Sequence, residues 1–543
     1  MGIPLLTKFD FNENLREILL IKPMPILNWI GKESVVNHDK EIPFRLLKKI
    51  KTHSVGDSEN LIIEGDNLEA LKALSPYYQN KIKCICIDPP YNTGNEHWVY
   101  NDNINSPKIK KWLGHVVGID DLTRHDKWLC MMYPRLKLLR ELLRDDGVIF
   151  ITISDNAIRD SGELYNLKLI MDEIFYEENF VANIIWQHSL QPKGYTDKFS
   201  VHHNHILCYR KTNLFQLQLL ERTEENNINY SNPDKDPKGL WRSGDVRNSL
   251  YRKNLIFDVV TTSGKIIKPP SKGWRWSSAT IQEKIQSGEI IFNKDETRMI
   301  RKIYLDTVEG RAPETIWFGD EVGTTRIASQ EIKDIFGEVV FETPKPVNLI
   351  KKIIKIATEK NDFILDSFAG SGTTGHAVLE LNKEDGGNRK FILIEMEDKI
   401  CKEITSQRIK KIIGGYSHDH VKVPGLGGGF QYCTLSKALF DEHGEIDEDC
   451  SFEDLASYIY FTETKTILDT KKIKNTLLGT YNDTEYHLIF NGIGKNSFDR
   501  KFLTSLDLHK DKVVYADKCT LDNNTLEKYH TVFKQIPYEV REF

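Results

Sequence analysis

The sequence predicts an α/β protein built on a doubly wound, mainly parallel sheet. Short apolar segments alternate with amphipathic ones over 60–211 and again over 341–424, as expected for parallel strands joined by crossover helices. A polar stretch, 212–340, interrupts this alternation, and 425–543 starts at a glycine-rich linker. Since 543 residues exceed what a single core accommodates, we expect these stretches to form separate domains.

The first half of the alternation supplies strands and helices in regular order. Residues 1–59 are expected to form helices and turns ahead of it. The segment "NLIIEGDNLEALKAL" predicts a strand, a turn and an amphipathic helix, and "KIKCICID" predicts a buried strand. The remaining segments predict a helix at 125–147, a strand at 148–154, a helix at 163–175 and two edge strands at 183–188 and 203–211.

The second half resumes the same pattern after the polar stretch. Its segments predict a helix at 346–358, a strand at 362–368, a helix at 373–382, a strand at 390–396 and a helix ending near residue 413. The segment "GLGGGF" is typical of a linker. The residues beyond it are expected to form a small α/β domain.

The composition is that of a globular protein without a membrane segment. Charged residues make up 28% and hydrophobic residues 40%, and no apolar run approaches the roughly 18 residues of a membrane helix. The eight cysteines include no CxxC pair, so disulfides and zinc ribbons are not expected and a reducing cytoplasm fits. The net charge of −5 argues against a general nucleic-acid binder, but residues 231–280 hold ten Lys and Arg against four Asp and Glu. That basic zone is compatible with DNA binding at one site.

The stretch "DSFAGSGTT" at 366–374 lies between a predicted strand and a predicted helix. Gly370 and Gly372 allow the backbone to approach a ligand closely, and the helix N-terminus offers free N–H groups. Small Ala369 and Ser371 keep the turn tight. The stretch lacks the full spacing of a dinucleotide-binding loop, and it is not a P-loop. It predicts a cofactor loop, with a plain strand–helix turn as the alternative.

An acid ends the strand that follows this loop. In "ILIEME", Glu395 lies where doubly wound folds place an acid that binds ribose hydroxyls. Glu397 is a rival for that role. A solvated carboxylate at a strand end is the alternative for Glu395.

The stretch "CICIDPPYNTGN" ends a buried strand on an acid and two prolines. Asp88 is an acceptor at the carboxyl edge of the sheet, where ligands bind in such folds. Pro89 and Pro90 remove two backbone donors and leave carbonyls free to accept, and Tyr91 offers a flat face. Two acceptors beside an aromatic ring suit a planar ring that carries an exocyclic amine. The stretch predicts a pocket for a base taken out of a helix, with an ordinary prolyl turn as the alternative.

The tetrapeptide "DPPY" with a separate "FAGSGTT" resembles the amino-methyltransferases that act on DNA with S-adenosylmethionine. The tetrapeptide precedes a variable insertion and the glycine loop, which is the permuted order of the family's beta class. The chain looks closer still to the modification (Mod) subunits of type III restriction systems. The segments that carry this likeness, within about residues 1–435, are "NWIGKESV", "NLIIEGDNLEAL", "IDPPYNTGNEHWVYND", "FETPKPVNLIKKII" and "GGFQYCTL".

The resemblance implies a fold, an activity and a set of site residues. The fold is a Rossmann-like methyltransferase sheet in permuted order, with an inserted target-recognition domain at 212–340 and a small C-terminal α/β domain. The activity is transfer of a methyl group from S-adenosylmethionine to adenine N6. The implied catalytic residues are Asp88, Pro89, Pro90 and Tyr91, and the implied cofactor-binding residues are Asp66, Lys345, Asp366, Phe368, Ala369, Gly370, Ser371, Gly372, Thr373 and Glu395.

The polar stretch is expected to recognise the DNA target. It interleaves arginines with aromatic residues in "GLWRSGDVRNSLYRKN" and "KGWRWSS". Arginines can bind guanine edges or phosphates, and aromatic rings can stack on bases. Ordinary core tryptophans are the alternative for any one position. The residues expected to contact DNA are Arg242, Arg247, Trp274, Arg275 and Trp276.

The histidines of "HHNHILC" do not predict a metal site. On a strand, His203 and His205 share one face while His202 lies on the other, so a plain strand-edge cluster is expected and no metal is assigned.

The resemblance also implies partners. These are double-stranded DNA, a second copy of the chain and a separate restriction subunit with helicase and nuclease activities, and the missing Walker loop fits a motor on another chain. The alternatives are a solitary methyltransferase or one from another phage-defence system, a cytosine-N4 methyltransferase, and a non-catalytic DNA-recognition subunit. Asp rather than Ser before "PPY" favours adenine by family habit.

Overall fold

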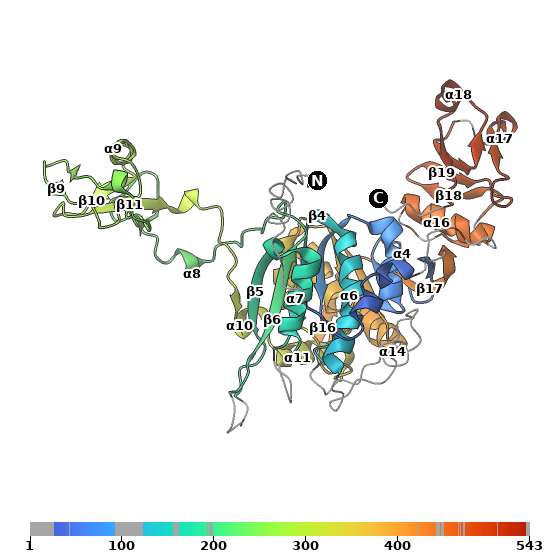
Figure 1. Ribbon diagram of the computed structural model, residues 1–543, viewed down its shortest axis with the longest axis horizontal. Helices are drawn as coiled ribbons and strands as arrows, with labels where there is room; N and C mark the ends of the chain where they lie inside the picture. The colour runs from blue at the N-terminus through green and yellow to red at the C-terminus, as the bar shows by residue number, and fades with distance from the viewer. Residues whose placement is uncertain are drawn as a thin grey trace, which may run out of the picture. The chain divides into compact units, whose positions relative to one another are not determined.

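The computed structural model describes residues 27–42, 44–92, 123–155, 162–192, 194, 199–419, 421–440, 446, 450–464, 466, 468–470, 473–507 and 509–538. The chain divides into two compact units, one formed by Met1–Gln216 with Glu314–Phe543 and the other by Leu217–Pro313 (Figure 1). The second half of the stretch "IDPPYNTGNEHWVYND", from residue 93 onward, lies outside the described residues.

A ten-stranded sheet forms the centre of the first unit. The six strands from β17 to β4 pair in parallel, whereas β1 is antiparallel to β17, and β6 is antiparallel to both β4 and β5. This arrangement is the doubly wound sheet that the sequence predicts. From edge to edge, the strands are β1 (Phe44–Lys49), β17 (Gln431–Phe440), β2 (Leu61–Glu64), β14 (Lys390–Glu395), β13 (Phe363–Asp366), β3 (Ile82–Ile87), β4 (Leu143–Ile153), β6 (His203–Arg210), β5 (Phe180–Gln187) and β12 (Ile316–Trp317).

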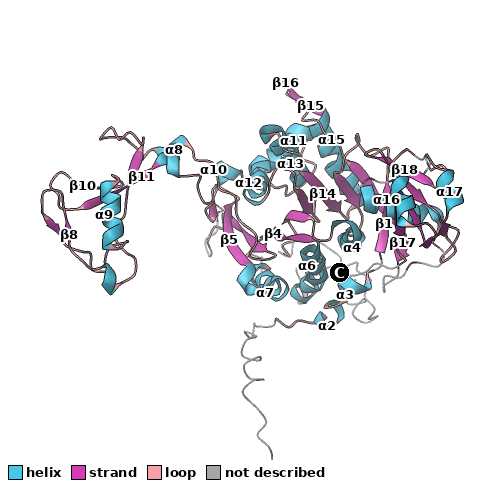
Figure 2. Cartoon of the chain, turned by 90° about the horizontal axis from the view of Figure 1, so that it is seen from above, coloured by secondary structure: helices cyan, strands magenta, loops and turns pink. Residues whose placement is uncertain are grey.

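Helices cover both faces of this sheet, as Figure 2 shows. The layer on one face is α4 (Asn67–Tyr78), α6 (Arg124–Leu142) and α7 (Leu164–Phe175), and the layer on the other is α12 (Val347–Ala357), α13 (Thr373–Asp385) and α15 (Ser406–Gly414). The shorter elements of this part are α2 (Lys32–Val35), α3 (His38–Glu41), the 3₁₀ turn η1 (Glu177–Asn179), α10 (Gly319–Val322), α11 (Thr325–Phe336), α14 (Asp398–Ile400), the π-helical turn η4 (Cys401–Thr405) and the hairpin of β15 (Gly415–His418) and β16 (Val421–Pro424).

The sequence pattern explains these layers. Every residue of β3 is buried, because a parallel strand with helices on both faces is apolar along its whole length. A helix of the covering layer is apolar on one side only. In α12, Leu349, Ile353 and Ile356 are buried while Lys355 is exposed, so the spacing that predicts the helix also docks it on the sheet.

Parallel pairing brings the carboxyl ends of β2, β14, β13 and β3 to one edge of the sheet. Glu64 lies beside Glu395 in the register of β2 and β14, and Ile85 lies beside Leu365 in that of β3 and β13. Strands β3 and β13 are neighbours in the sheet, although the insertion and four other strands of the sheet separate them in the sequence. The chain turns that follow these four strands therefore lie at the same edge.

The C-terminal residues form a smaller α/β structure within the first unit. The ring of Phe461 in α16 (Phe452–Thr464) packs edge-on against Tyr77 of α4, with centroids 4.4 Å apart. The other elements are the sheet of β18 (Leu477–Tyr481), β19 (Thr484–Leu488), β21 (Lys512–Ala516) and β23 (Thr531–Gln535), the pair β20 (Ser497–Phe498) and β22 (Lys518–Cys519), and the helices α17 (Arg500–Thr504) and α18 (Asn523–Lys528).

The second unit has a small core of its own, which includes Val259, Trp274, Ile281 and Ile290. Its elements are the antiparallel sheet of β10 (Ile290–Phe292), β11 (Met299–Tyr304) and β7 (Trp241–Gly244), the pair β8 (Val259–Val260) and β9 (Ile266–Ile267), the helices α8 (Glu224–Asn227) and α9 (Ser278–Gln286), and the 3₁₀ turns η2 (Lys253–Leu255) and η3 (Leu305–Thr307).

The predicted fold class is confirmed, while three of the expected domain limits differ from the structure. Residues 314–340, expected in the insertion, belong to the first unit, because β12 pairs with β5. Residues 1–59, expected to lack strands, contain β1. The range 425–543, expected to be a separate domain, contains β17, which lies in the main sheet because it pairs with both β1 and β2.

The structure also bears on two expectations drawn from the composition, which concern the cysteines and membrane-spanning helices. All eight cysteines are free thiols. Among the described residues, no helix combines the length and the apolar character needed to cross a membrane.

Candidate active site

A cavity of about 770 Å³ lies at the carboxyl edge of the main sheet. The strands β2, β14, β13 and β3 end there, and this is where doubly wound folds bind their ligands. The structure brings to this cavity every residue expected to act in catalysis or cofactor binding except Gly372. The lining residues of that set are Asp66, Asp88, Pro89, Pro90, Tyr91, Lys345, Asp366, Phe368, Ala369, Gly370, Ser371, Thr373 and Glu395.

Asp88 directly follows β3, and an ion pair fixes one of its oxygens. The Lys345 ammonium binds Asp88 Oδ2 and lies 5.3 Å from the centre of the Tyr91 ring. Asp88 Oδ1 is buried and accepts no hydrogen bond from the described residues. One oxygen is therefore held in place, while the other keeps its lone pairs for a donor that enters the cavity.

The prolyl turn after Asp88 is fixed from the helix layer. The indole N–H of Trp128, in α6, donates to the Pro90 carbonyl at 2.7 Å. Asn92 then turns the chain with a φ of 57°, and its amide donates to Glu163 Oε1 at 2.5 Å. Contacts on both sides thus position Asp88 and Tyr91 in the cavity wall.

The loop between β13 and α13 needs both of its glycines. Gly370 and Gly372 have φ values of 49° and 79°, in the left-handed region that favours glycine. A Cβ at position 370 would lie 3.0 Å from Phe341 Cζ, and one at position 372 would lie 3.2 Å from Thr405 Cγ2. Backbone conformation and space therefore both require residues without a side chain.

Glu395, at the end of β14, is the acid tied to this loop. Its Oε2 accepts from the Gly370 N–H at 2.8 Å and its Oε1 from the Glu397 N–H at 3.0 Å. Burial raises the pKa of the Glu395 carboxyl, although these hydrogen bonds oppose the shift. The rival Glu397 also lines the cavity but is exposed. The buried acid is thus Glu395.

Asp366 supports the same loop from its first position. Its Oδ2 accepts from the Thr374 hydroxyl at 2.6 Å and its Oδ1 from the Phe368 N–H at 3.1 Å. The pKa of Asp366 is raised to about 7, chiefly by burial. The nearby charges of Asp88 and Glu395 add to this shift, and the two hydrogen bonds oppose it. A carboxyl with this pKa changes its charge near neutral pH.

Asp66 has a structural contact as well as a place in the cavity wall. Its Oδ1 caps α4 by accepting from the Leu68 N–H at 2.9 Å and the Glu69 N–H at 3.1 Å. Its Oδ2 lies 3.3 Å from the guanidinium of Arg135, which also lines the cavity. The sequence does not predict the role of Arg135, since nothing in the motif around residue 66 indicates which helix residue faces it.

Arg408, in α15, is a second site residue that the sequence does not predict. It is fully buried beneath the glycine loop, where its Nη1 donates to Ser371 Oγ at 3.1 Å and to Thr373 Oγ1 at 2.9 Å. Burial lowers the pKa of Arg408 to about 10, and the nearby Glu331 opposes that shift. An arginine in the apolar spacing of a helix was the only sequence signal for this support.

The five residues expected to contact DNA all lie in the second unit, and four of them are accessible. Arg242, Arg247 and Arg275 are exposed, and Trp276 is partly buried. Trp274 is a correction: its side chain is 97% inaccessible as part of the unit's core, and its indole donates to the Phe257 carbonyl at 2.8 Å. Its ring therefore offers no face to DNA, and the alternative of a core tryptophan holds at this position.

The accessible arginines of the second unit differ in the contacts that their side chains make. The Arg247 guanidinium forms a paired contact with Asp245, with Nε–Oδ1 at 2.9 Å and Nη2–Oδ2 at 3.0 Å. The Arg275 guanidinium lies 5.5 Å from the centre of the Trp276 ring. Arg247, Arg275 and Lys272 line one hollow of about 640 Å³, so this unit carries a concave basic surface.

Comparison with known proteins identifies relatives over most of the chain. A family described as DNA methylase matches residues 82–406. The type III restriction-modification enzyme StyLTI Mod subunit of Salmonella typhimurium is 36% identical over 65% of this chain and 54% of its own length. The EcoPI Mod subunit of Escherichia phage P1 is 33% identical over 73% of this chain and 69% of its own length. The type II methyltransferase M.KpnI of Klebsiella pneumoniae is 32% identical over 66% and 85%, respectively.

These matches confirm the resemblance that the sequence motifs predict. The chain spans about half the length of the Salmonella relative and about two thirds of the phage relative. The matched range 82–406 contains both the tetrapeptide at 88–91 and the glycine loop, so it covers both sides of the cavity. The chain therefore belongs to the N6/N4 DNA methylase family.

Proposed function

We propose that the chain is a site-specific DNA methyltransferase that transfers a methyl group from S-adenosylmethionine to adenine N6. One observation carries this proposal: the tetrapeptide 88–91 and the glycine loop 366–373, far apart in the sequence, line a single cavity. One side of that cavity suits a planar ring with an amine, and the other side suits a cofactor with ribose and charged groups.

The loop side of the cavity fits S-adenosylmethionine. Glu395 offers a carboxylate for ribose hydroxyls, and Ser367 Oγ is buried in the wall without a hydrogen-bond partner among the described residues. The loop leads into the N-terminus of α13, where backbone N–H groups are available. A volume of about 770 Å³ is ample for a ligand of this size. When bound, S-adenosylmethionine supplies a methyl group on a positively charged sulfur.

The tetrapeptide side fits the exocyclic amine of a base. Asp88 Oδ1 and the Pro89 carbonyl accept the two N–H bonds of the amine, and the Tyr91 ring stacks on the base. Accepting these hydrogen bonds draws the nitrogen toward tetrahedral geometry and localises its lone pair. The same acceptors stabilise the positive charge that develops on nitrogen.

The proposed methyl transfer does not need a strong base before the nitrogen attacks. Bound S-adenosylmethionine would supply the methyl carbon, which would leave sulfur as it bonds to the amine nitrogen, and Asp88 and the Pro89 carbonyl would hold that nitrogen in position. The methylated nitrogen is acidic and releases one proton, which Asp88 or water accepts. Asp88 thus polarises the amine and receives a proton late, and it is not a nucleophile.

Adenine is favoured over cytosine as the target base. Both bases present a ring amine, so the pocket chemistry alone suits either. The acid of Asp88, in place of a serine before "PPY", favours adenine in this family.

The second unit, Leu217–Pro313, recognises the DNA target in this proposal. Its exposed Arg242, Arg247 and Arg275 can bind phosphates or guanine edges. The chain acts as a homodimer and works with a separate restriction subunit. The names of the Mod relatives support a place in a type III restriction system.

A solitary methyltransferase is the second candidate. The relative M.KpnI, a type II methyltransferase, matches over 85% of its own length. Genes that flank this one distinguish the two candidates, because a type III system places a helicase–nuclease gene beside the modification gene.

The decisive test replaces Asp88. We expect Asp88→Asn to abolish transfer of labelled methyl groups to DNA, because one acceptor becomes a donor, and to leave S-adenosylmethionine affinity within about 3-fold in calorimetry. Asp57→Asn, at a fully exposed carboxylate outside the cavity, is the matched control and keeps full activity. Normal methyl transfer by the Asp88 variant would refute the assignment, and sequencing of the modified DNA would separate N6-methyladenine from N4-methylcytosine.

A further inference from the structure

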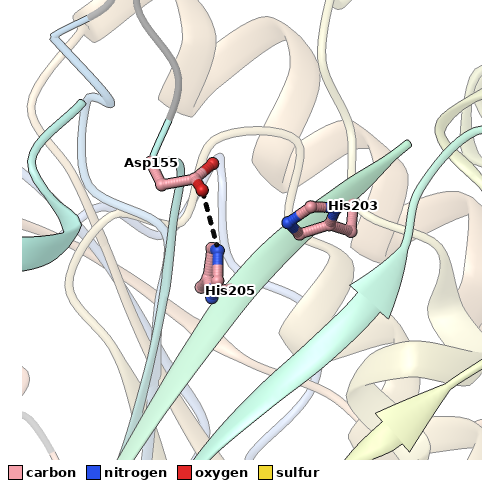
Figure 3. A group of neighbouring side chains, drawn as sticks. All are labelled: Asp155, His203 and His205. Carbon is pink, nitrogen blue, oxygen red and sulfur yellow. Dashed lines mark ion pairs between the residues drawn. The ribbon is translucent and has the colours of Figure 1, made fainter. Parts of the chain in front are cut away.

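Three side chains with metal-binding atoms converge at the carboxyl end of β4, as Figure 3 shows. Asp155 follows the last residues of that strand, and His203 and His205 lie at the start of the antiparallel strand β6. The register pairs Ile153 with His205, which brings the carboxylate and both imidazoles together. None of the three lines the cavity described above.

The distances within this group suit a metal ion. One ligand atom from each residue lies within 4.8 Å of the other two. Asp155 Oδ2 and His205 Nε2 are 3.4 Å apart. Tetrahedral coordination with bonds of about 2.1 Å separates neighbouring ligand atoms by about 3.4 Å, so this pair already has the spacing of two ligands on one ion.

The hydrogen bonding of His205 points its free nitrogen into the group. Its Nδ1 lies 3.0 Å from Asn183 Oδ1 on β5, and since a carbonyl oxygen only accepts, Nδ1 carries the proton. In the neutral imidazole, Nε2 then presents a lone pair. This is the arrangement in which a metal-ligating histidine is oriented by a second partner on its other nitrogen.

Two buried atoms of the group have no hydrogen-bond partner among the described residues. These are His205 Nε2 and Asp155 Oδ1, and the His205 side chain as a whole is more than nine-tenths buried. With Nδ1 protonated, an imidazole lone pair and a carboxylate face each other at 3.4 Å. Such a contact is unfavourable unless a cation, either a proton on Nε2 or a metal ion, lies between them.

We propose that Asp155, His203 and His205 bind one divalent transition-metal ion. Two imidazoles with one carboxylate suit Zn²⁺ or Co²⁺, whereas Mg²⁺ and Ca²⁺ take oxygen ligands. Asp155 and His203 are only partly buried, so an ion can enter and water can complete its coordination. The ion links β4 to β6, and β4 lies next to β3, the strand that Asp88 follows.

Sequence reasoning assigned no metal here because it saw only the histidines. His203 and His205 share a strand face but need a third ligand. That ligand comes from a different strand, and only the antiparallel register of β4 with β6 shows it. The proposal is independent of methyl transfer, so failure of one leaves the other unaffected.

The test measures binding of Zn²⁺ and Co²⁺ to the untagged full-length chain after removal of metals with a chelator. We expect one Zn²⁺ per chain by equilibrium dialysis with elemental analysis, visible absorption bands on addition of Co²⁺, and no stoichiometric binding of Mg²⁺. His203→Ala and Asp155→Asn should each weaken Zn²⁺ binding by about 100-fold or more, because each removes a direct ligand. Zn²⁺ should also raise the Tm of the wild-type chain and of neither variant.

A matched control lies one residue away on the same segment. His202 precedes the strand face in question and its Nε2 contacts Ser200 Oγ at 2.9 Å, so His202→Ala should bind Zn²⁺ like the wild type. The proposal is overturned if the wild-type chain takes up no Zn²⁺. It is equally overturned if His203→Ala, folded as judged by circular dichroism, binds Zn²⁺ with unchanged affinity.

Discussion

The ammonium of Lys345 binds the carboxylate on which the proposed chemistry depends. The family resemblance implied that Lys345 binds the cofactor. Its backbone does contact the glycine loop, since Thr373 Oγ1 donates to the Lys345 carbonyl at 3.2 Å, but its side chain reaches Asp88 and Tyr91. A single residue thus connects the two sides of the cavity and orients the carboxylate before a base arrives.

Replacing Lys345 should therefore slow methyl transfer. We expect Lys345→Met to lower kcat/KM for DNA by about 10-fold to 100-fold, because Asp88 loses the ion pair that fixes its orientation. Lys345→Arg keeps a cation and should retain more activity than the methionine variant. Steady-state kinetics with labelled cofactor measure both, and a methionine variant with wild-type kcat/KM would contradict the orienting role.

Asp366 gives the fold a measurable dependence on pH. Its pKa is about 7 in the folded chain against a reference of 3.8, so between about pH 4 and pH 7 the folded state binds more protons than the unfolded state. The free energy of unfolding should therefore fall as pH rises through this window, by at most about 1.4 kcal/mol per pH unit from this group. Asp366→Asn should remove that slope, and urea unfolding of both proteins at pH 5 and pH 7.5 measures it. Equal slopes for the two proteins would contradict the assignment.

The loop from β13 to α13 depends on the helix packed beneath it. Arg408 of α15 donates to two loop hydroxyls, and the Thr405 hydroxyl donates to the Gly370 carbonyl at 2.6 Å. The conformation of the loop is thus set by contacts outside its own sequence. A motif predicts that such a loop binds a ligand, while the element below it determines its shape.

Gly372 offers a direct test of this dependence. We expect Gly372→Ala to lower the free energy of unfolding by about 1–3 kcal/mol and to weaken S-adenosylmethionine binding, because the new Cβ would meet Thr405 at 3.2 Å in a left-handed backbone. Gly386→Ala is the matched control, since Gly386 has a φ of 67° but open space around its Cβ. Urea unfolding and calorimetry should show the smaller loss, about 1 kcal/mol, for the control. Equal losses in the two variants would exclude a role for the contact with Thr405.

At the scale of the whole molecule, the proposed function assigns chemistry and recognition to different units. The cavity is built entirely from the first unit, and the concave surface around Arg247 and Arg275 belongs to Leu217–Pro313. Substitutions in one unit should therefore change one property at a time.

DNA binding tests this separation. We expect Arg275→Gln to weaken DNA binding, to reduce the salt slope of log K by about 1 if the contact is to a phosphate, and to leave S-adenosylmethionine affinity unchanged. Lys518→Gln, at an exposed lysine of β22 in the first unit, is the control and should match the wild type. Fluorescence anisotropy over a range of salt concentrations measures the effect. Unchanged DNA affinity in the Arg275 variant would remove this residue from the interface.

The sequence predicted the parts of the molecule that depend on local pattern. The buried strands, the amphipathic helices and the turns at their carboxyl ends follow from residue periodicity, and parallel pairing then places Asp88, Asp366 and Glu395 together. The contacts that the prediction missed join residues through packing rather than pattern. Arg408 supports the loop from below, and Trp274 lies in a core that no motif identifies. The place of β17 in the main sheet was not predicted, because its partner strands β1 and β2 lie nearly four hundred residues away in the chain.

The adjacency of β3 and β13 has a consequence for synthesis on the ribosome. Strand β3 emerges from the ribosome long before β13, and at typical translation rates the delay is on the order of tens of seconds. During that interval β3 is an apolar strand with one unpaired edge, the kind of segment that chaperones shield. A nascent chain released early therefore contains the tetrapeptide at 88–91 but could not carry out the proposed methyl transfer. The glycine loop that forms the other wall of the cavity has not yet been translated.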